Sequence, residues 1–384
     1  MRFENAASPA NLPRRVNQQS TSKDAVQDLF GPRVTNRRVT VFTQSASVEL
    51  DEGGRGHGRD EDGASRIRKV TSKLLASGLT RVVKAPPADW SEKIDALAHQ
   101  FPNMRDLISS VVRPHVALVA RGMDHRLAPI LLVGAPGIGK THFANELATV
   151  LGVGSPLVVS MASESNNSTL GGSSTFWSNS APGRLFEILA WGQSLAMPIA
   201  NPLVVLDEVD KVRSRNMQFD PLGTLYTLLE VETARNFTDQ SLPDLRIDAS
   251  HCRIVATAND VSEIAEPLLS RMLVCPVRQP SVNELSEMVR SMYLRLVQKF
   301  ELEMMSDLSQ DVIDVALRMS PREAKMRLDC ALASAVVDGR NSIQLADWPA
   351  MAANQQRVQR RPIGFTALVD PPGNHRSAMK VSPT

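Results

Sequence analysis

Apolar positions divide the chain into segments of different periodicity. Up to about residue 65, polar and charged residues predominate, and only Val39–Phe42 and Ala46–Leu50 form short apolar patches. Such a composition rarely buries enough apolar surface to offset the entropy of the chain. The pattern therefore predicts that residues 1–65 form a mostly disordered polar arm, or an arm that becomes ordered on a partner.

Helical periodicity begins at about residue 66. Apolar residues recur at intervals of three and four in Ile67–Leu79, Trp90–Phe101 and Met104–Ala120, which is typical of amphipathic helices. We expect these helices to form a lead-in segment over residues 66–125.

Four short apolar runs follow, with helical stretches between them: Ala128–Val133, Leu157–Ser160, Leu203–Leu206 and Arg253–Thr257. Near-continuous apolar runs separated by helices are typical of a parallel sheet that is covered on both faces. Residues 126–280 are therefore predicted to form an α/β nucleotide-binding domain of the phosphate-loop class.

A small all-helical domain is predicted over residues 281–350. Two S-x-x-E capping boxes mark helix starts there, at Ser281 with Glu284 and at Ser320 with Glu323. Apolar residues at helical spacing follow both boxes, and no strand-like run occurs after Pro280. The remaining residues, 351–384, are expected to form a flexible tail.

Bulk composition excludes several classes of protein. The net charge of +2 and the aromatic content of 4% favour neither nucleic acid nor an anionic membrane as a partner. The three cysteines are widely spaced, so neither a disulfide framework nor a zinc site is expected. No apolar stretch of about 18 residues could span a membrane. These observations predict a cytoplasmic protein.

A complete phosphate-loop motif, G-x-x-x-x-G-K-T, follows the first apolar run. It consists of Gly134, Ala135, Pro136, Gly137, Ile138, Gly139, Lys140 and Thr141. Its glycines allow a tight turn in which backbone N–H groups converge on phosphate oxygens. The Lys140 ammonium can reach the β- and γ-phosphates, and the Thr141 hydroxyl can bind Mg²⁺. The motif predicts ATP and Mg²⁺ as ligands.

Two adjacent acids end the apolar run at residues 203–206. Ligands of a parallel sheet bind at the carboxyl ends of its strands, where Asp207 and Glu208 are expected. Asp207 is predicted to hold Mg²⁺, and Glu208 to act as the general base that polarises the attacking water. Taken alone, the pair could also be surface acids at a strand end.

Three further polar residues are candidates for the same chemistry. Asn259 ends the last apolar run and could orient the attacking water beside Glu208, although asparagine also commonly starts loops. Arg271 lies in a short helical stretch and could reach the γ-phosphate of a neighbouring subunit as an arginine finger. Arg322 starts a capped helix and could face a phosphate across the interdomain cleft.

Together these motifs resemble the AAA+ ATPases, and among them the ATPase module of the Lon-type proteases. The resemblance runs from about Met104 to Val337. It rests on the sequences GAPGIGKT, LDEVDKV, DPLGTLYTLLEVETARNFTD (residues 220–239), VATAND and EPLLSRM. It implies that Asn259 is sensor 1, Arg271 the arginine finger and Arg322 sensor 2.

The resemblance also implies a ring, usually a hexamer, with nucleotide at the subunit interfaces. Phe176 and Trp177 lie where the family has an aromatic pore loop that grips a polypeptide; the alternative is that Trp177 packs in a core or against a hairpin. Only some tens of residues follow Ala346, whereas a domain usually needs roughly 100–200. No protease domain, and hence no protease activity, is therefore expected.

The sequence therefore predicts a ring-forming, Mg²⁺-dependent ATPase that remodels or unfolds proteins. A nucleotide-gated interaction module is the alternative, and the basic tail leaves a DNA-associated ATPase as a third.

Overall fold

We describe the protein from a computed structural model. The described residues are 36–44, 61–163, 168–175, 180–193, 196–212 and 222–349, with only the backbone described for 44 and 61–64. The predicted tail at 351–384, most of the predicted arm, and Phe176 and Trp177 lie outside these ranges.

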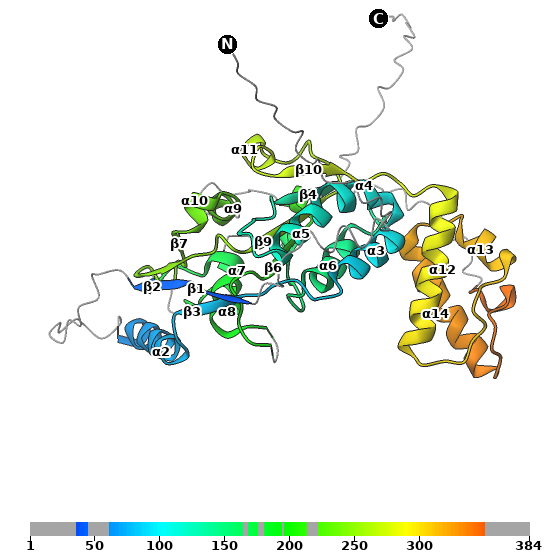
Figure 1. Cartoon of the computed structure of the whole chain (residues 1–384), viewed down its shortest axis with the longest axis horizontal. Coiled ribbons are helices and arrows are strands. Elements are labelled where there is room, and N and C mark those ends of the chain that lie inside the picture. The colour runs from blue at the N-terminus through cyan, green and yellow to red at the C-terminus, as the bar shows by residue number, and fades with distance from the viewer. Residues whose placement is uncertain are drawn as a thin grey trace, which may run out of the picture.

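A five-stranded parallel sheet forms the centre of the molecule (Figure 1), with the strand order β10-β4-β9-β6-β5. Its strands are β4 (Ile130–Val133), β5 (Leu157–Ser160), β6 (Leu203–Asp207), β9 (Arg253–Ala258) and β10 (Leu273–Pro276). The four strands predicted from the apolar runs are confirmed. The prediction missed β10, an edge strand whose side chains are mostly exposed.

Side chains of the central sheet alternate between two apolar cores, one on each face. In β4, Ile130 and Leu132 pack with one cluster, and Leu131 between them packs with the other. Helices cover both faces, as predicted, because successive strand residues point to opposite sides. The first cluster takes in α3 (Trp90–Gln100) and α6 (Lys140–Leu151), and the second takes in α8 (Arg184–Trp191).

The helix predicted over Met104–Ala120 is continuous but changes its pitch. It consists of η1 (Pro102–Met104), α4 (Arg105–Leu107), the π-helical turn η2 (Ile108–Val112) and α5 (Arg113–Ala120). Pro114, in the first turn of α5, has no N–H to donate, and its ring would crowd the carbonyl four residues earlier. A wider π turn just before Pro114 relieves that conflict.

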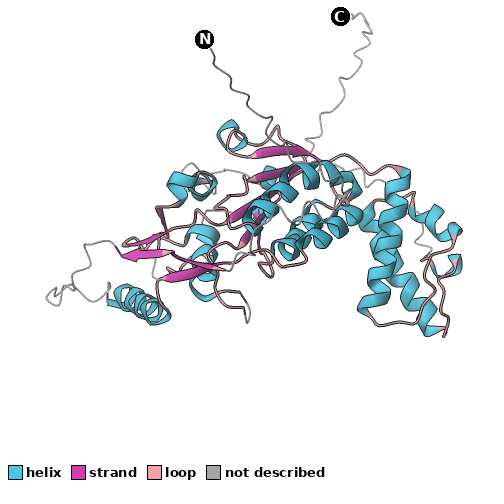
Figure 2. Cartoon of the chain, in the orientation of Figure 1, coloured by secondary structure: helices cyan, strands magenta, loops and turns pink. Residues whose placement is uncertain are grey.

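Two small antiparallel sheets accompany the central one. They are formed by β1 (Arg37–Thr40) with β3 (Thr80–Val83), and by β2 (Phe42–Gln44), β8 (Leu245–Ile247) and β7 (Phe237–Thr238). The remaining helices near the sheet are α2 (Glu61–Ser77), η3 (Met161–Ser163), α7 (Ser168–Gly171), η4 (Val209–Lys211), α9 (Gly223–Leu229), α10 (Val231–Ala234) and α11 (Glu266–Leu269). Figure 2 distinguishes these strands and helices by colour.

For residues 36–44 the structure corrects the expected disorder of the arm. Val41 and Phe42 are fully buried in the core, and the Phe42 ring meets that of Phe186 edge to face, with 5.8 Å between centroids. The short apolar patch in the sequence is thus long enough to form a strand that pairs with β3 and a second strand that pairs with β8. Their partners β3 and β8 are distant in sequence, so the local composition could not reveal them.

The helical domain contains α12 (Val282–Lys299), α13 (Gln310–Ala316), α14 (Pro321–Val337) and η5 (Leu345–Asp347). These elements surround an apolar core of their own, and they lie at one end of the molecule (Figure 1). Both predicted capping boxes are present: the Ser281 and Ser320 hydroxyls accept from the N–H groups of Glu284 and Glu323. We call this domain the lid. Within the described residues, no helix is long and apolar enough to cross a membrane.

Candidate nucleotide site

The phosphate loop connects β4 to α6, at the carboxyl edge of the central sheet. Gly137 and Gly139 adopt left-handed φ values of 81° and 102°, which residues other than glycine rarely adopt. A Cβ on Gly134 would lie 2.3 Å from the Val277 carbonyl oxygen, so only glycine allows the loop to approach the chain after β10. Ile138 points away from the loop into the core.

Lys140 is buried beneath the phosphate loop. Its ammonium donates to the Gly134 carbonyl (2.7 Å), the Ala135 carbonyl (3.0 Å) and the Asn259 Oδ1 (3.0 Å). Burial lowers the pKa of Lys140, and the carboxylates of Asp210 and Asp207 act in the opposite direction. The three protein acceptors hold the cation where the loop turns. A bound phosphate would replace at least one of them, since an ammonium has three N–H donors.

The acidic pair is organised by a threonine that the sequence analysis did not select. Asp207 Oδ1 accepts from the hydroxyls of Thr141 (2.7 Å) and Thr257 (2.6 Å). The Glu208 N–H donates to the same Thr257 hydroxyl at 3.0 Å. Glu208 has a left-handed φ of 58°, and strained conformations of this kind gather at functional sites. Thr257 therefore fixes the positions of both acids.

Asn259 follows β9 and meets the phosphate loop through the Lys140 contact, so the neighbouring strands β6 and β9 bring Asp207, Glu208 and Asn259 to one edge. These groups suit Mg²⁺ and a nucleotide, because carboxylate and hydroxyl oxygens are the ligands that Mg²⁺ prefers. Thr141 Oγ1 and Asp207 Oδ1, already in contact, are the pair that would hold the ion.

A cleft with a volume of about 370 Å³ lies between this edge and the lid. Pro136, Gly137, Gly139, Lys140, Thr141, Asp207, Glu208, Thr257 and Asn259 line its inner wall. The lid contributes three cations to the opposite wall: Arg295 of α12, and Arg322 and Lys325 of α14. Arg322 was predicted to face the cleft. Arg295 and Lys325 were missed, because only the packing of the lid against α3 turns them toward the loop.

Gln100, Phe101 and His142 form one side of the cleft. The His142 Nε2 lies 3.1 Å from the Gln100 Nε2, and its ring meets that of Phe101 edge to face. Burial, together with the charges of Lys325 and Arg295, lowers the pKa of His142 to about 4. The imidazole is therefore neutral at pH 7.

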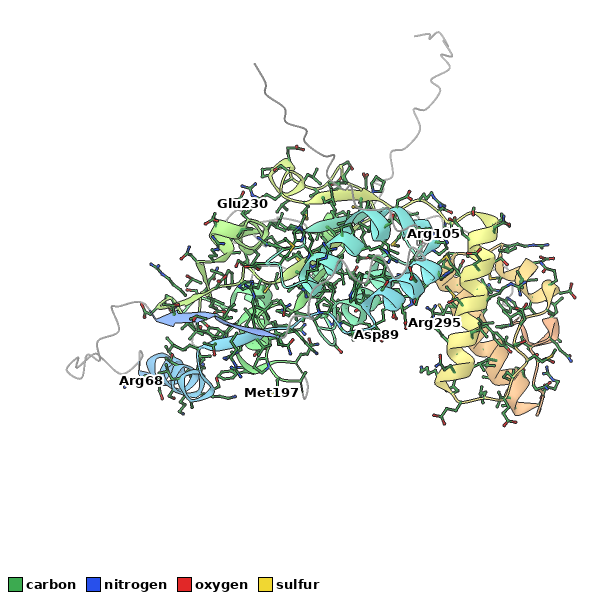
Figure 3. All side chains as sticks on the ribbon, in the orientation of Figure 1. Arg68, Asp89, Arg105, Met197, Glu230 and Arg295 are labelled. Carbon is green, nitrogen blue, oxygen red and sulfur yellow. The ribbon has the colours of Figure 1, made fainter. Side chains whose placement is uncertain are left out.

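Arg271 does not line this cleft. Its Nε pairs with the Glu230 carboxylate at 2.6 Å, its Nη1 donates to the Pro267 carbonyl, and its guanidinium lies 5.9 Å from the Tyr226 ring centroid. Figure 3 labels Glu230 near α10 and Arg295 beside the lid, on different sides of the molecule. Arg271 therefore has no contact with the nucleotide site of its own chain.

Hydrogen bonds hold the chain on either side of the predicted pore loop. The Ser173 N–H donates to the Ala181 carbonyl, and Asp239, fully buried, accepts from the N–H groups of Gly183 and Ser241. Trp177 itself lies outside the described residues, so its predicted role stays a prediction.

The fold and the site define an AAA-type nucleotide-binding domain. Residues 130–275 match the family model of the "ATPase family associated with various cellular activities (AAA)". A closed-state cryo-EM reconstruction of Hsp104 with ATPγS and FITC casein shares this fold, with a TM-score of 0.52 and 16% identity over 66% of this chain and 49% of that one.

Two curated relatives that the chain matches are Lon proteases. The chain is 31% identical to the mitochondrial Lon protease homolog of Ostreococcus lucimarinus over 312 residues, which is 80% of this chain and 32% of that protein. It is 35% identical to the Lon protease of Bacillus thuringiensis over 55% of this chain and 27% of that protein. The chain thus spans a third or less of the length of these two relatives.

Proposed function

We propose that the chain binds ATP with Mg²⁺ in the cleft below the lid and hydrolyses it. The observation that carries the proposal is the 2.7 Å contact between Thr141 Oγ1 and Asp207 Oδ1, beside the buried Lys140. It joins a hydroxyl and a carboxylate in the arrangement that a nucleotide-bound Mg²⁺ requires. When bound, Mg²⁺ would neutralise charge on the phosphates.

Residues of the chain would bind the phosphates, accept the proton and orient the attacking water. Lys140 and the backbone of residues 134–141 would hold the phosphates, and Arg322 would approach them from the lid. Glu208, exposed at the end of β6, would accept a proton from the attacking water. Asn259 would orient that water while it also contacts Lys140.

A Glu208→Gln variant tests this assignment. We expect it to bind ATP normally and to lose ATPase activity by about 100-fold or more, because it removes the general base but no phosphate contact. Nucleotide affinity and phosphate release are the two measurements. Glu287→Gln, on the exposed side of α12, is the control and should keep full activity. Full activity in Glu208→Gln would contradict the proposed site.

We further propose a homo-oligomeric ring, hexameric by family resemblance, in which Arg271 reaches the nucleotide of the next subunit. Support comes from its position outside the cleft of its own chain and from its single carboxylate partner, Glu230, among the described residues. Transition-state contacts from arginine fingers commonly contribute ~10³-fold or more. Arg271→Ala should therefore assemble normally and hydrolyse ATP slowly, as sizing and phosphate release would measure.

The likeness to Lon proteases supports a protein substrate, which the ring would remodel or unfold. A pull-down with Glu208→Gln in ATP would identify it, because a slowly hydrolysing ring should retain its substrate. Recovery of the same proteins with Lys140→Ala, which should not bind ATP, would contradict nucleotide-dependent capture. The three free cysteines support a reducing compartment such as the cytoplasm.

A further inference from the structure

A second cavity lies at the amino edge of the central sheet, opposite the nucleotide site. It is bounded by the chain before β4, by Asn201 before β6, and by Arg253 at the start of β9. Its volume is about 60 Å³, several times the ~10–15 Å³ that one water molecule needs. It is thus large enough for a small polyatomic ion and too small for a nucleotide.

Positive charge predominates in the wall of this cavity. Arg37, Lys84, Arg126 and Arg253 line it, together with the single carboxylate of Asp124. Asp124 pairs with Arg37, so it does not compensate the other cations. Neither Arg126 nor Arg253 forms an ion pair with a carboxylate of the described residues.

The Arg126 guanidinium has N–H groups without a protein acceptor. Its Nη2 donates to the Leu228 carbonyl at 2.9 Å, but Nε and Nη1 are buried and have no acceptor among the described residues. Asp248 is the nearby carboxylate that favours the charged form of Arg126. It is already engaged, because its Oδ1 accepts from the Ser250 N–H and hydroxyl at 3.0 and 2.6 Å.

Arg253 is buried more deeply, with 4% of its surface exposed. Its Nη1 makes a long hydrogen bond of 3.4 Å to the Asn201 carbonyl. Burial lowers the pKa of Arg253 to about 10, so the group is still charged at pH 7. The neighbouring Cys252 cannot balance that charge, because burial raises the pKa of its thiol to about 12.

We propose that this cavity binds a small tetrahedral oxyanion of the phosphate or sulfate class, held by Arg126 and Arg253. Buried guanidinium groups that form no direct ion pair are costly, and an anion in the cavity would lower that cost. The planar fork of arginine donates two parallel hydrogen bonds to such an oxyanion. The site is independent of the proposed ATPase activity, since it shares no residue with the nucleotide cleft.

A sulfate titration of the full chain tests the proposal. Saturating ADP with Mg²⁺ keeps the phosphate loop occupied, and sodium chloride at equal ionic strength is the reference. We expect the melting temperature of the wild type to rise with sulfate along a saturable curve. Arg126→Gln should lose the saturable part. Arg318→Gln, which removes an exposed arginine from the lid, should keep it.

Sulfate also stabilises proteins in general, by exclusion from their surface. Equal responses of all three proteins would therefore overturn the proposal, as would a response to acetate but not to sulfate.

Crystals soaked in selenate give a second measurement that does not depend on the folding of a variant. The proposal expects an anomalous peak within hydrogen-bond distance of Arg126 and Arg253. Its absence at selenate concentrations that saturate the melting curve would overturn the site.

Discussion

Thr257 is the residue on which the geometry of the two acids depends. Its hydroxyl donates to Asp207 and accepts from the N–H of Glu208. Glu208 is the residue whose backbone adopts a left-handed φ. A single side chain therefore aligns a proposed metal ligand and a proposed base. The sequence did not reveal it, because a threonine in a buried strand is most simply explained by its preference for strands.

Replacing Thr257 by valine should lower activity without abolishing nucleotide binding. The substitution keeps the shape of the side chain and removes both hydrogen bonds, so we expect kcat to fall ~10–100-fold, as for other residues that orient metal ligands. Steady-state phosphate release measures the effect. Thr238→Val, at an exposed position of β7, is the matched control. An unchanged kcat for Thr257→Val would show that the acids hold their positions unaided.

His115 should make stability depend on pH. It is buried beside His125, with 2.9 Å between the two Nδ1 atoms. Burial, with the positive charge of Arg253, lowers its pKa to about 3. The unfolded chain therefore binds a proton below its ordinary pKa of ~6.5, whereas the folded chain does not. Stability is then greatest above pH 6.5 and falls as the pH decreases toward 3.

The contribution of one such group is at most ~1.4 kcal/mol per pH unit. Urea unfolding at pH 5 and pH 7 should show a smaller difference for His115→Gln than for the wild type. His99→Gln, at an exposed position, should retain the wild-type difference. An equal pH dependence in both variants would contradict the role of His115.

At the scale of elements, the sequence predicted the helix starts and strands that depend on residues close together in the chain. Two helices of the lid, α12 and α14, begin where their capping boxes lie, because a cap is made within four residues. The buried strands were found because near-continuous apolar runs leave few alternatives. The exposed edge strand β10 and the strands of residues 37–44 were missed, since their pairing depends on partners distant in sequence.

The nucleotide site likewise combines residues that local motifs predict with residues that only long-range packing brings together. The phosphate loop and the acids are contiguous motifs, so the sequence predicted them. Arg295 and Lys325 reach the cleft only through the packing of α12 against α3 and the register of α14. No spacing in the sequence encodes that orientation.

The cap of α14 should influence both stability and the cleft. Ser320→Ala removes the hydroxyl that accepts from the Glu323 N–H, at a cost of ~1 kcal/mol. It also loosens the first turn, which carries Arg322, so we expect KM for ATP to rise. Ser309→Ala is the matched control, since Ser309 is the N-cap residue of α13 and makes no side-chain capping bond. A similar loss of stability in both variants would contradict the capping argument.

At the scale of the whole molecule, the proposed ring assigns one nucleotide site to two chains. Glu208 would act on the nucleotide of its own chain, and Arg271 on the nucleotide of the next chain. Mixing Glu208→Gln with Arg271→Ala should therefore restore part of the activity that each variant lacks, because some interfaces then combine an intact Glu208 with an intact Arg271. Phosphate release from pre-mixed and separately assayed proteins measures this. Activity no higher than the mean of the two variants would place both residues in one chain.

The separate core of the lid has a consequence for how the protein melts. The lid encloses its own apolar cluster and meets the α/β domain mainly through α12 and across the cleft. Calorimetry of the nucleotide-free chain should therefore resolve two heat-absorption peaks, one for each cooperative unit. A nucleotide that contacts both walls couples the units, so the peaks should merge in the presence of Mg²⁺ and an ATP analogue. With Arg322→Ala they should stay apart, and the heat trace would then report directly on whether the two halves of the molecule melt as one.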